Sequence, residues 1–468
     1  MPHMKGFTDA DADALPLHVV ARSTFASWHA AQSPQASAWL DAQGFDGAPG
    51  SVLALPGEDG RIAAAVLGIG DPLDPYSYAH APFGLPARAW RLHGELEPAA
   101  LAALQLGWGL GAYRFDRYKQ PPRQPAQLLI QSAPTQDDQQ AEALDVLAAC
   151  IRVRDLVNTP TEHMGPDQLE SVACEIAERH GARIQVISGD DLLTQNFPAI
   201  HAVGRASHRA PRLVMLHWGD DDAGHPHVAI VGKGVCFDTG GLNIKVADGM
   251  RNMKKDMGGA AHAIALAELV MARRLPLRIT LLVPAVENAL GPESFRPGEV
   301  IATRAGASVE IDNTDAEGRV VLGDALTYAG ELAPDLLLDF ATLTGAARIA
   351  LGPDLPALYS NDEALATQWL AAAAQQRDPL WRMPLWRPYL RYLTSSIADL
   401  ANSGPSRMAG SIAAALYLER FVPEQQAWAH LDVYAWNDAD RPGRPCGGEA
   451  QGLRSAFAML QARCADRT

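Results

Sequence analysis

The sequence predicts an α/β protein with a small N-terminal α/β domain and a larger C-terminal domain, whose mainly parallel mixed sheet is sandwiched by helices. Three observations lead to this prediction. The chain has 468 residues, which is more than one ordinary core organises. Segments that are apolar on both faces alternate with helix-length segments, as in sheets covered by helices on both sides. A stretch rich in proline and glutamine, residues 120–136, interrupts this pattern and marks an interdomain connection.

The N-terminal third has the pattern of a small α/β domain, which we place at residues 1–136. Short apolar runs bounded by turn residues predict its strands, and the apolar spacing of residues 97–113 predicts a helix among them. The strands are expected at residues 17–20, 51–55, 62–69 and 128–130.

A long helix is predicted to connect the domains over residues 137–158. Leu144, Leu147 and Ile151 follow one another at helical spacing, and Pro160 ends the run. The second domain is therefore expected over residues 159–468. Its near-continuous apolar runs predict strands at residues 213–216, 228–231, 279–283, 336–338 and 427–433.

Composition and charge argue against several classes of function. The formal net charge of −15 disfavours a protein that binds nucleic-acid phosphates, because such binding depends on clustered Lys and Arg. No uncharged apolar run has the length of a signal peptide or a membrane span. The five cysteines are scattered without a CxxC pair, which is typical of reduced thiols. We therefore expect a cytoplasmic protein without a membrane or nucleic-acid partner.

Polar side chains gather just beyond the predicted strands, where parallel sheets usually bind their ligands. A glycine-rich turn follows the strand at 228–231, and an acidic loop follows the strand expected at Val309-Glu310-Ile311. Thr342 and Leu343 follow the strand at 336–338 in the same way. The charged residues are Lys233, Asp238 and Lys245 in the turn, and Asp315, Glu317 and Arg319 in the loop.

Four carboxylates predict a metal site: those of Asp238, Asp315 and Glu317 in these segments, and that of Asp256 between them in the sequence. Asp315 and Glu317 are two residues apart, so both can reach one cation. If Asp238 and Asp256 converge on the same point, the four groups repel one another unless some are protonated or cations neutralise them. Carboxylate oxygens are preferred ligands of hard divalent metals. Two such ions that share a water lower its pKa and polarise a carbonyl group, which suits the hydrolysis of an amide.

Two cations, Lys245 and Arg319, would remain beside the carbonyl oxygen, where negative charge develops in the transition state, and should act mainly on rate. Taken singly, these features also fit a tight turn, a solvated loop or a charged helix face, and only their coincidence favours a catalytic site. Cys236 lies between two of the candidate ligands, but we do not expect it to be a nucleophile. His262, in an alanine-rich segment, is expected to be packed in the core.

Residues 313–319 read Asn-Thr-Asp-Ala-Glu-Gly-Arg, and this run resembles the signature of the leucyl aminopeptidase family, the cytosol aminopeptidases. Seven residues in one order are a specific signal. The resemblance covers roughly residues 155–435, and overall layout alone supports it in the N-terminal third. Further matches occur at residues 231–245, 254–261 and 341–346, with weaker ones at 157–160 and 428–432.

The resemblance implies that the C-terminal domain is catalytic and holds two divalent metal ions, manganese or zinc, with magnesium or cobalt as alternatives. Asp238 and Glu317 would bridge the two ions. Lys233 and Asp256 would complete the ligands of one ion, and Asp315, also through its backbone carbonyl, those of the other. A lysine ligand must lose a proton that it holds at a reference pKa of about 10.4, and an adjacent dication favours that loss.

The resemblance also implies a reaction. Lys245 would polarise the substrate carbonyl, and Arg319 would bind a bicarbonate ion that acts as general base. The α-amino group of the peptide would bind one metal and the Leu343 carbonyl, so only peptides with a free N-terminus would be cut. Met253 and Thr342 would line the pocket for the first side chain, preferably leucine or another apolar residue. Family members form hexamers, so a homohexamer is expected.

Two other functions stay open at this point. Paired metals also clamp phosphoryl oxygens, so a two-metal phosphoesterase would use the same acids. Some relatives of the family bind DNA, so an aminopeptidase with an added DNA-binding regulatory role is the second alternative. The acidic balance of the chain argues against that added role.

Overall fold

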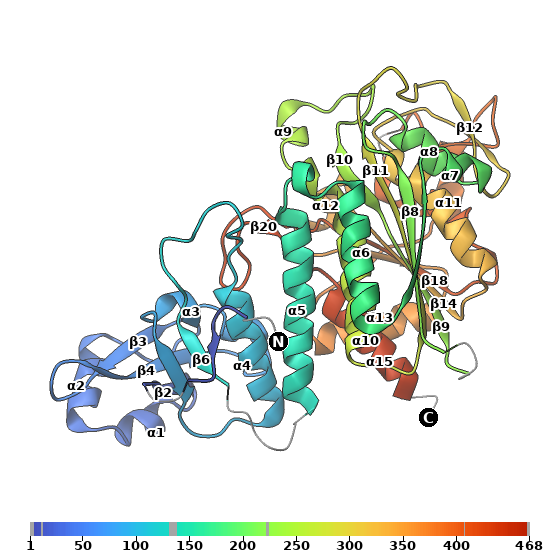
Figure 1. Cartoon of the computed structure of the whole chain (residues 1–468). Coiled ribbons are helices and arrows are strands. Elements are labelled where there is room, and N and C mark those ends of the chain that lie inside the picture. The colour runs from blue at the N-terminus through green and yellow to red at the C-terminus, as the bar shows by residue number, and fades with distance from the viewer. Residues whose placement is uncertain (1–3, 11–12, 131–137, 221–223, 407, 466–468) are drawn as a thin grey trace. The chain divides into compact units, whose positions relative to one another are not determined.

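The chain forms two compact units in the computed structural model, which describes residues 4–10, 13–130, 138–220, 224–406 and 408–465 (Figure 1). One unit comprises Met1–Ile151 and Ala439–Cys446, and the other comprises Arg152–Asp438 and Gly447–Thr468. The division falls within helix α5 (Asp138–Asn158). The sequence analysis places its boundaries at residues 136 and 158, near the two ends of this helix.

The first unit is built on a six-stranded sheet. Its strands are β1 (Phe7–Thr8), β2 (Leu15–Ala21), β3 (Val52–Pro56), β4 (Ile62–Ile69), β5 (Ala89–Leu92) and β6 (Gln127–Leu129). They lie in the order β1-β6-β5-β2-β4-β3, and all pairs are parallel except β3 with β4. The predicted helix is α4 (Pro98–Ala112), and buried side chains of Tyr78, Trp90 and Trp108 belong to the core.

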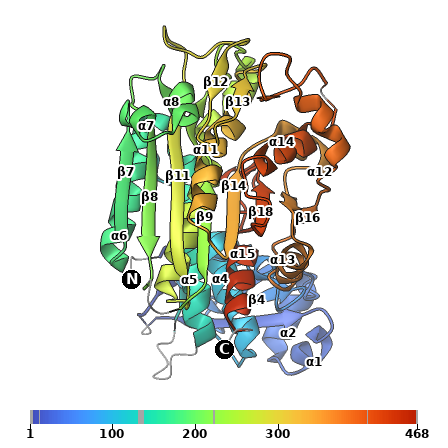
Figure 2. The same ribbon diagram turned by 90° about the vertical axis from the view of Figure 1, so that its right-hand side faces the viewer.

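The second unit is built on a nine-stranded mixed sheet (Figure 2). Its strands are β7 (Arg183–Ser188), β8 (Arg212–Trp218), β9 (His227–Gly232), β10 (Gly234–Asp238), β11 (Arg278–Asn288), β14 (Leu336–Ala341), β15 (Ala357–Ser360), β16 (Trp381–Arg382) and β18 (Trp428–Asp432). The path runs β16-β15-β18-β14-β9-β11-β8-β7, with β10 paired to β11. The central pairs β18–β14, β14–β9, β9–β11 and β11–β10 are parallel. The pairs β7–β8, β8–β11 and β15–β18 are antiparallel.

Helices cover both faces of this sheet, as the sequence predicts. Helices α6 (Pro166–His180) and α10 (Gly258–Ala272) pack on one face, and α8 (Pro198–Gly204) and α11 (Glu317–Glu331) pack on the other (Figures 1 and 2). The remaining larger helices are α12 (Gly345–Leu351), α13 (Glu363–Gln375), α14 (Gly410–Glu419) and α15 (Leu453–Ala465). Among the described residues, no helix is both long and apolar enough to cross a bilayer.

Two glycines let helix α10 approach the sheet closely. A Cβ atom on Gly259 would lie 2.1 Å from the carbonyl oxygen of Phe340, and one on Gly232 would lie 2.6 Å from the Cα of Ala260. Only glycine allows such an approach of backbone to backbone. The segment that enters α10 is thereby held against the ends of β9 and β14, which places Asp256 next to Lys233.

One predicted strand belongs to a different sheet. The segment Val309-Glu310-Ile311 overlaps β13 (Ser308–Glu310), which pairs with β12 (Val300–Ala302) and β17 (Leu400–Ala401) in a separate three-stranded sheet. The expectation that Asp315 and Glu317 follow a strand of the main sheet is therefore wrong. They lie instead in the segment that leaves this small sheet and begins α11, on the face of the main sheet.

Candidate active site

A cavity of about 360 Å³ lies beyond the carboxyl ends of β9, β10 and β14, within the second unit. All ten residues that the sequence singles out for function line it: Lys233, Asp238, Lys245, Met253, Asp256, Asp315, Glu317, Arg319, Thr342 and Leu343. Seven of them are charged. The cavity therefore concentrates ionisable groups from separate stretches of the chain.

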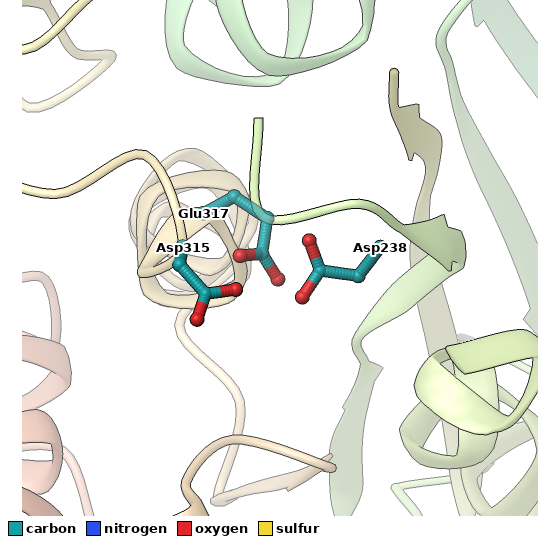
Figure 3. A group of neighbouring side chains, drawn as sticks. All are labelled: Asp238, Asp315 and Glu317. Atoms are coloured by element: carbon teal, nitrogen blue, oxygen red, sulfur yellow. The ribbon is translucent and has the colours of Figure 1, made fainter. Parts of the chain in front are cut away.

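Three carboxylates converge in this cavity (Figure 3). Asp238 ends β10, Asp315 lies in the loop before α11, and Glu317 is the first residue of that helix. Each offers one oxygen that lies within 4.8 Å of those of the other two. The Oε2 atom of Glu317 is buried and has no hydrogen-bond partner among the described residues. Oxygen ligands at this spacing, one of them lacking a partner, fit a divalent metal ion.

Lys233 joins this group to Asp256. Its Nζ lies 2.8 Å from Asp256 Oδ2 and 3.0 Å from Glu317 Oε1, and it donates a hydrogen bond of 3.0 Å to the carbonyl oxygen of Thr342. Burial of this lysine, which is 2% exposed, opposes its charge. The carboxylates of Asp256, Glu317 and Asp238 outweigh that effect and raise the pKa of Lys233 above its ordinary value. Metal ligation by Lys233 therefore requires the loss of a tightly held proton.

Lys245 is the second cation among the acids. Its Nζ lies 2.7 Å from Asp238 Oδ2 and also forms an ion pair with Asp315. Burial again opposes the charge, but Asp238, Glu317 and Asp315 raise the pKa of Lys245 above its ordinary value. In the metal-free protein the two lysines therefore act as counter-ions of the acids.

Two of the acids titrate near neutrality. Burial raises the pKa of Asp256 to about 7, helped by Asp238 and Glu317, while Lys233 opposes the shift. Burial likewise raises the pKa of Asp315 to about 7, helped by Asp238 and opposed by Lys245. In this part of the cavity, four carboxylates therefore share the two ammonium groups that form ion pairs with them. That imbalance is what a bound dication would remove.

Asn288 and Thr314, which the sequence analysis did not select, hold the acidic loop against the glycine-rich turn. Asn288 Nδ2 donates to Asp238 Oδ1 at 2.8 Å and to the carbonyl oxygen of Thr314 at 3.0 Å. The hydroxyl of Thr314 donates to the carbonyl oxygen of Gly240 at 2.6 Å and accepts from the backbone N–H of Asn243 at 2.8 Å. Gly240 has a φ of +85°, which favours glycine at this turn.

Arg319 reaches the cavity from the first turn of α11. It is 9% exposed, and its Nη1 donates to the carbonyl oxygen of Asn402 at 2.9 Å. Its Nε has no hydrogen-bond partner among the described residues, and burial lowers its pKa. The side chain of Asn402 accepts from the backbone of Asp312 at 2.9 Å and donates to that of Asn313 at 2.7 Å. A single asparagine from a distant segment thus fixes both the acidic loop and the guanidinium.

Asp432, at the end of β18, fixes the backbone at Leu343. Its carboxylate accepts from the N–H groups of Leu343 at 3.0 Å and of Thr344 at 3.1 Å, and from the Thr344 hydroxyl at 2.7 Å. The preceding residue, Thr342, donates through its hydroxyl to Asp256 Oδ1 at 2.9 Å. The segment after β14 is therefore held rigidly beside the acids.

The comparisons with known proteins agree with this geometry. The model of the cytosol aminopeptidase family, catalytic domain, matches residues 151–456, which is more than half of the chain. This protein belongs to the cytosol aminopeptidase family. The model of the M17 aminopeptidase N-terminal domain matches residues 15–131. The chain is therefore a peptidase that acts as an aminopeptidase.

Individual relatives of the family are similar over most of their length. A probable cytosol aminopeptidase of Syntrophotalea carbinolica is 37% identical over 395 residues, 82% of this chain and 77% of that protein. The crystal structure of the cytosol aminopeptidase from Coxiella burnetii has a TM-score of 0.92 at 44% identity, covering 98% of this chain and 99% of that one. The bottromycin maturation enzyme BotP in complex with Mn has a TM-score of 0.86 at 33% identity, covering 97% and 100%.

Two side chains near the site of this cytosol aminopeptidase take no part in it, as the sequence predicts. Cys236 is buried, and burial raises the pKa of its thiol well above the ordinary value, which disfavours the thiolate that a nucleophile requires. His262 is fully buried within α10. Its Nδ1 donates to the carbonyl oxygen of Gly258 at 2.6 Å and its Nε2 accepts from the N–H of Gln451 at 2.9 Å, so it is a packed, neutral histidine.

Lys255, Arg348 and Tyr434 are among the other residues that line the cavity, and none of the three was predicted. Lys255 was not selected from the sequence, where a lysine beside Asp256 also fits a charged helix face. Its side chain points inward instead, because η4 (Met253–Met257) is a 3-10 helix pressed against β10. Burial lowers the pKa of Lys255 to about 8, and the neighbouring Asp256 opposes that shift. The cavity therefore has a basic side as well as an acidic one.

Proposed function

We propose that this aminopeptidase works with two divalent metal ions in each subunit. Asp238 and Glu317 would bridge them, Lys233 and Asp256 would complete one ligand set, and Asp315 the other. The buried cluster of carboxylates, with an unpartnered oxygen on Glu317, is the observation that carries the proposal. Manganese or zinc is expected, and magnesium and cobalt suit the same ligands. BotP, a structural relative, was solved with Mn.

The bound ions would supply a water of lowered pKa and a polarised carbonyl, which amide hydrolysis needs. The residues of the chain perform the rest. Lys245 is placed among the acids, so its ammonium can stabilise the negative charge that develops on the carbonyl oxygen. Arg319 has a donor without a protein partner beside the cavity, and we propose that it holds a bicarbonate ion as the general base.

The substrate is proposed to be a peptide with a free N-terminus, recognised by its α-amino group. Asp432 fixes the backbone of Leu343, whose carbonyl is the proposed acceptor for that amino group. Met253 and Thr342 line the same cavity and form the proposed pocket for the first side chain. A flexible thioether adapts to several apolar side chains, so leucine and similar residues are expected to fit.

Release of p-nitroaniline from leucyl-p-nitroanilide, by protein reconstituted with manganese at mildly alkaline pH, tests the proposal. Metal-dependent release is the expected result, with none in the presence of a chelator. If p-nitrophenyl phosphate were hydrolysed and the anilide were not, the phosphoesterase alternative would replace the proposal. A salt-sensitive shift of duplex DNA in a gel would support an added DNA-binding regulatory role. The net charge of −15 argues against that role.

We further propose that the protein is a cytoplasmic homohexamer. The names of its relatives as cytosol aminopeptidases support the location. The hexamer rests on the family resemblance. Light scattering should then give a mass six times the 50.1 kDa of one chain, and a monomeric mass would contradict this assembly.

A further inference from the structure

One side of the cavity, lined by Lys255, Arg348 and Tyr434, is basic, and we call it the basic wall. Lys255 comes from η4, Arg348 from α12, and Tyr434 lies just after β18. The Nζ of Lys255 lies 4.7 Å from the centroid of the Tyr434 ring, and the Cζ of Arg348 lies 4.8 Å from it. Two cations from distant segments are thus gathered on one aromatic ring.

Lys255 is only 6% exposed, yet among the described residues its ammonium forms no ion pair. The acids that act on it electrostatically, Asp256 and Asp432, are already held by other groups. The hydroxyl of Tyr434 donates to Asp438 Oδ1 at 2.9 Å and is also hydrogen-bonded to Arg348, so both its donor and its acceptor are already used. A buried ammonium without an anionic partner is costly, which indicates that its partner is a ligand.

The basic wall is part of the pocket that we propose for the first side chain. Met253 and Lys255 lie two residues apart on η4, and both line the cavity. A Cβ atom on Gly258 would lie 3.0 Å from Thr342 Cγ2 and 2.6 Å from Ala435 Cβ, so Thr342 and the chain after β18 both pack against Gly258. Met253 and Thr342 therefore share one cavity with Lys255 and Tyr434.

We propose that this pocket recognises a carboxylate, so that peptides beginning with glutamate or aspartate are substrates. The inference rests on the proposed aminopeptidase function and specifies its substrate class. Met253 and the Tyr434 ring would contact the methylene groups of the first side chain. Lys255 would form a charge-assisted hydrogen bond with its carboxylate, supported by Arg348 from the exposed rim.

Kinetics with three anilides tests the inference, since p-nitroanilides lack a terminal carboxylate and isolate the first side chain. For the wild type, kcat/KM should be about tenfold or more higher for α-glutamyl- than for glutaminyl-p-nitroanilide. The Lys255→Met substitution should lower that ratio to about one, because it removes the charge. The Lys255→Arg substitution should preserve the wild-type ratio. A wild type that cleaves the leucyl substrate but treats the glutamyl and glutaminyl substrates alike would overturn the inference. If no anilide were cleaved at all, the aminopeptidase proposal would fail as well.

Lys254 offers a matched control. It carries the same charge one residue away, but its Nζ donates to the carbonyl oxygen of Asn158 at 2.6 Å, and it does not line the cavity. Lys254→Met should therefore leave the glutamyl-to-glutaminyl ratio unchanged, and an equal loss in both variants would show that the effect of Lys255→Met is not local. Calorimetry adds a readout without turnover: manganese-loaded protein should bind L-glutamate more tightly than L-glutamine, and equal affinities would overturn the inference.

Discussion

Individual charges in the cavity are balanced by groups that face each other across it. Lys233 lies between Asp256 and Glu317, and Lys245 lies between Asp238 and Asp315. These pairs exclude most of the solvent that would otherwise hydrate them, so each charge depends strongly on the others. The pKa of about 7 for Asp256 and Asp315 is one result of that dependence.

The raised pKa values of Asp256 and Asp315 predict how the stability of the metal-free protein varies with pH. Their folded-state pKa of about 7 lies above the ordinary value of 3.8, so their protonated forms favour the fold. This contribution to the free energy of unfolding is complete below the pKa of the unfolded state. It is lost as pH rises through the pKa of the folded state. With a chelator present, the melting temperature should fall between about pH 5 and 8.

Calorimetric melting at several pH values, with and without manganese, checks this expectation. Saturating manganese should remove the fall, because the ions neutralise the deprotonated acids. Asp315→Asn should reduce the slope of the metal-free protein. Parallel pH profiles with and without metal would contradict the assignment of these acids.

Lys245→Met separates rate from metal binding. The variant loses an ammonium placed to stabilise the transition-state oxyanion, so kcat should fall by about 10²- to 10³-fold. Its metal content, measured by mass spectrometry of the dialysed protein, should stay at the wild-type level. Wild-type turnover in this variant would exclude an electrophilic role for Lys245.

The residues that could be predicted from the sequence are those within distinctive local motifs. Asp315, Glu317 and Arg319 lie within seven residues of one another, and the structure places them at the same cavity. Asn402 and Tyr434 belong to no such motif, and each acts on partners far away in the chain. Only the folded structure brings them to the site.

Among the elements, helix α11 does most to organise the site. Glu317 is its first residue, Arg319 lies in its first turn, and Glu331 is its last. An anionic group at a helix N-terminus is favoured by the unpaired N–H groups and the dipole there. The same helix therefore presents one glutamate to the cavity and another, which pairs with Arg304, to the solvent.

Substitutions at the two ends of α11 test this division. Glu317→Gln should reduce both metal content and kcat/KM by about 100-fold or more, because it removes a bridging carboxylate charge. Glu331→Gln changes the same chemistry on a side chain that is 46% exposed, and should leave both quantities near wild type. Full manganese occupancy in Glu317→Gln would remove this residue from the ligand set.

Elements with a continuous apolar run could be predicted closely. The run at 228–231 becomes β9 (His227–Gly232), and the run at 336–338 becomes β14 (Leu336–Ala341). The edge strand β7 was not predicted, because its sequence Arg-Ile-Gln-Val-Ile-Ser contains no continuous apolar run of the kind used to assign the other strands of this sheet. The segment Val309-Glu310-Ile311 overlaps strand β13, but composition does not tell which sheet that strand joins.

In the whole molecule, the predicted α/β class and mainly parallel sheet are confirmed. Parallel strands brought to one edge explain why residues as distant as Lys233 and Thr342 meet there. The cavity, its acids and its basic wall all lie within the second unit. The function proposed for this unit depends on its carboxylates forming a metal site rather than only a network of ion pairs.

Anomalous scattering from crystals grown with manganese tests that claim most directly. We expect two peaks in each subunit, both contacted by Asp238 and Glu317, with Lys233 and Asp256 at one and Asp315 at the other. A map from the same crystals that showed no peak among these side chains, with Lys233 and Lys245 still paired to the acids, would contradict it.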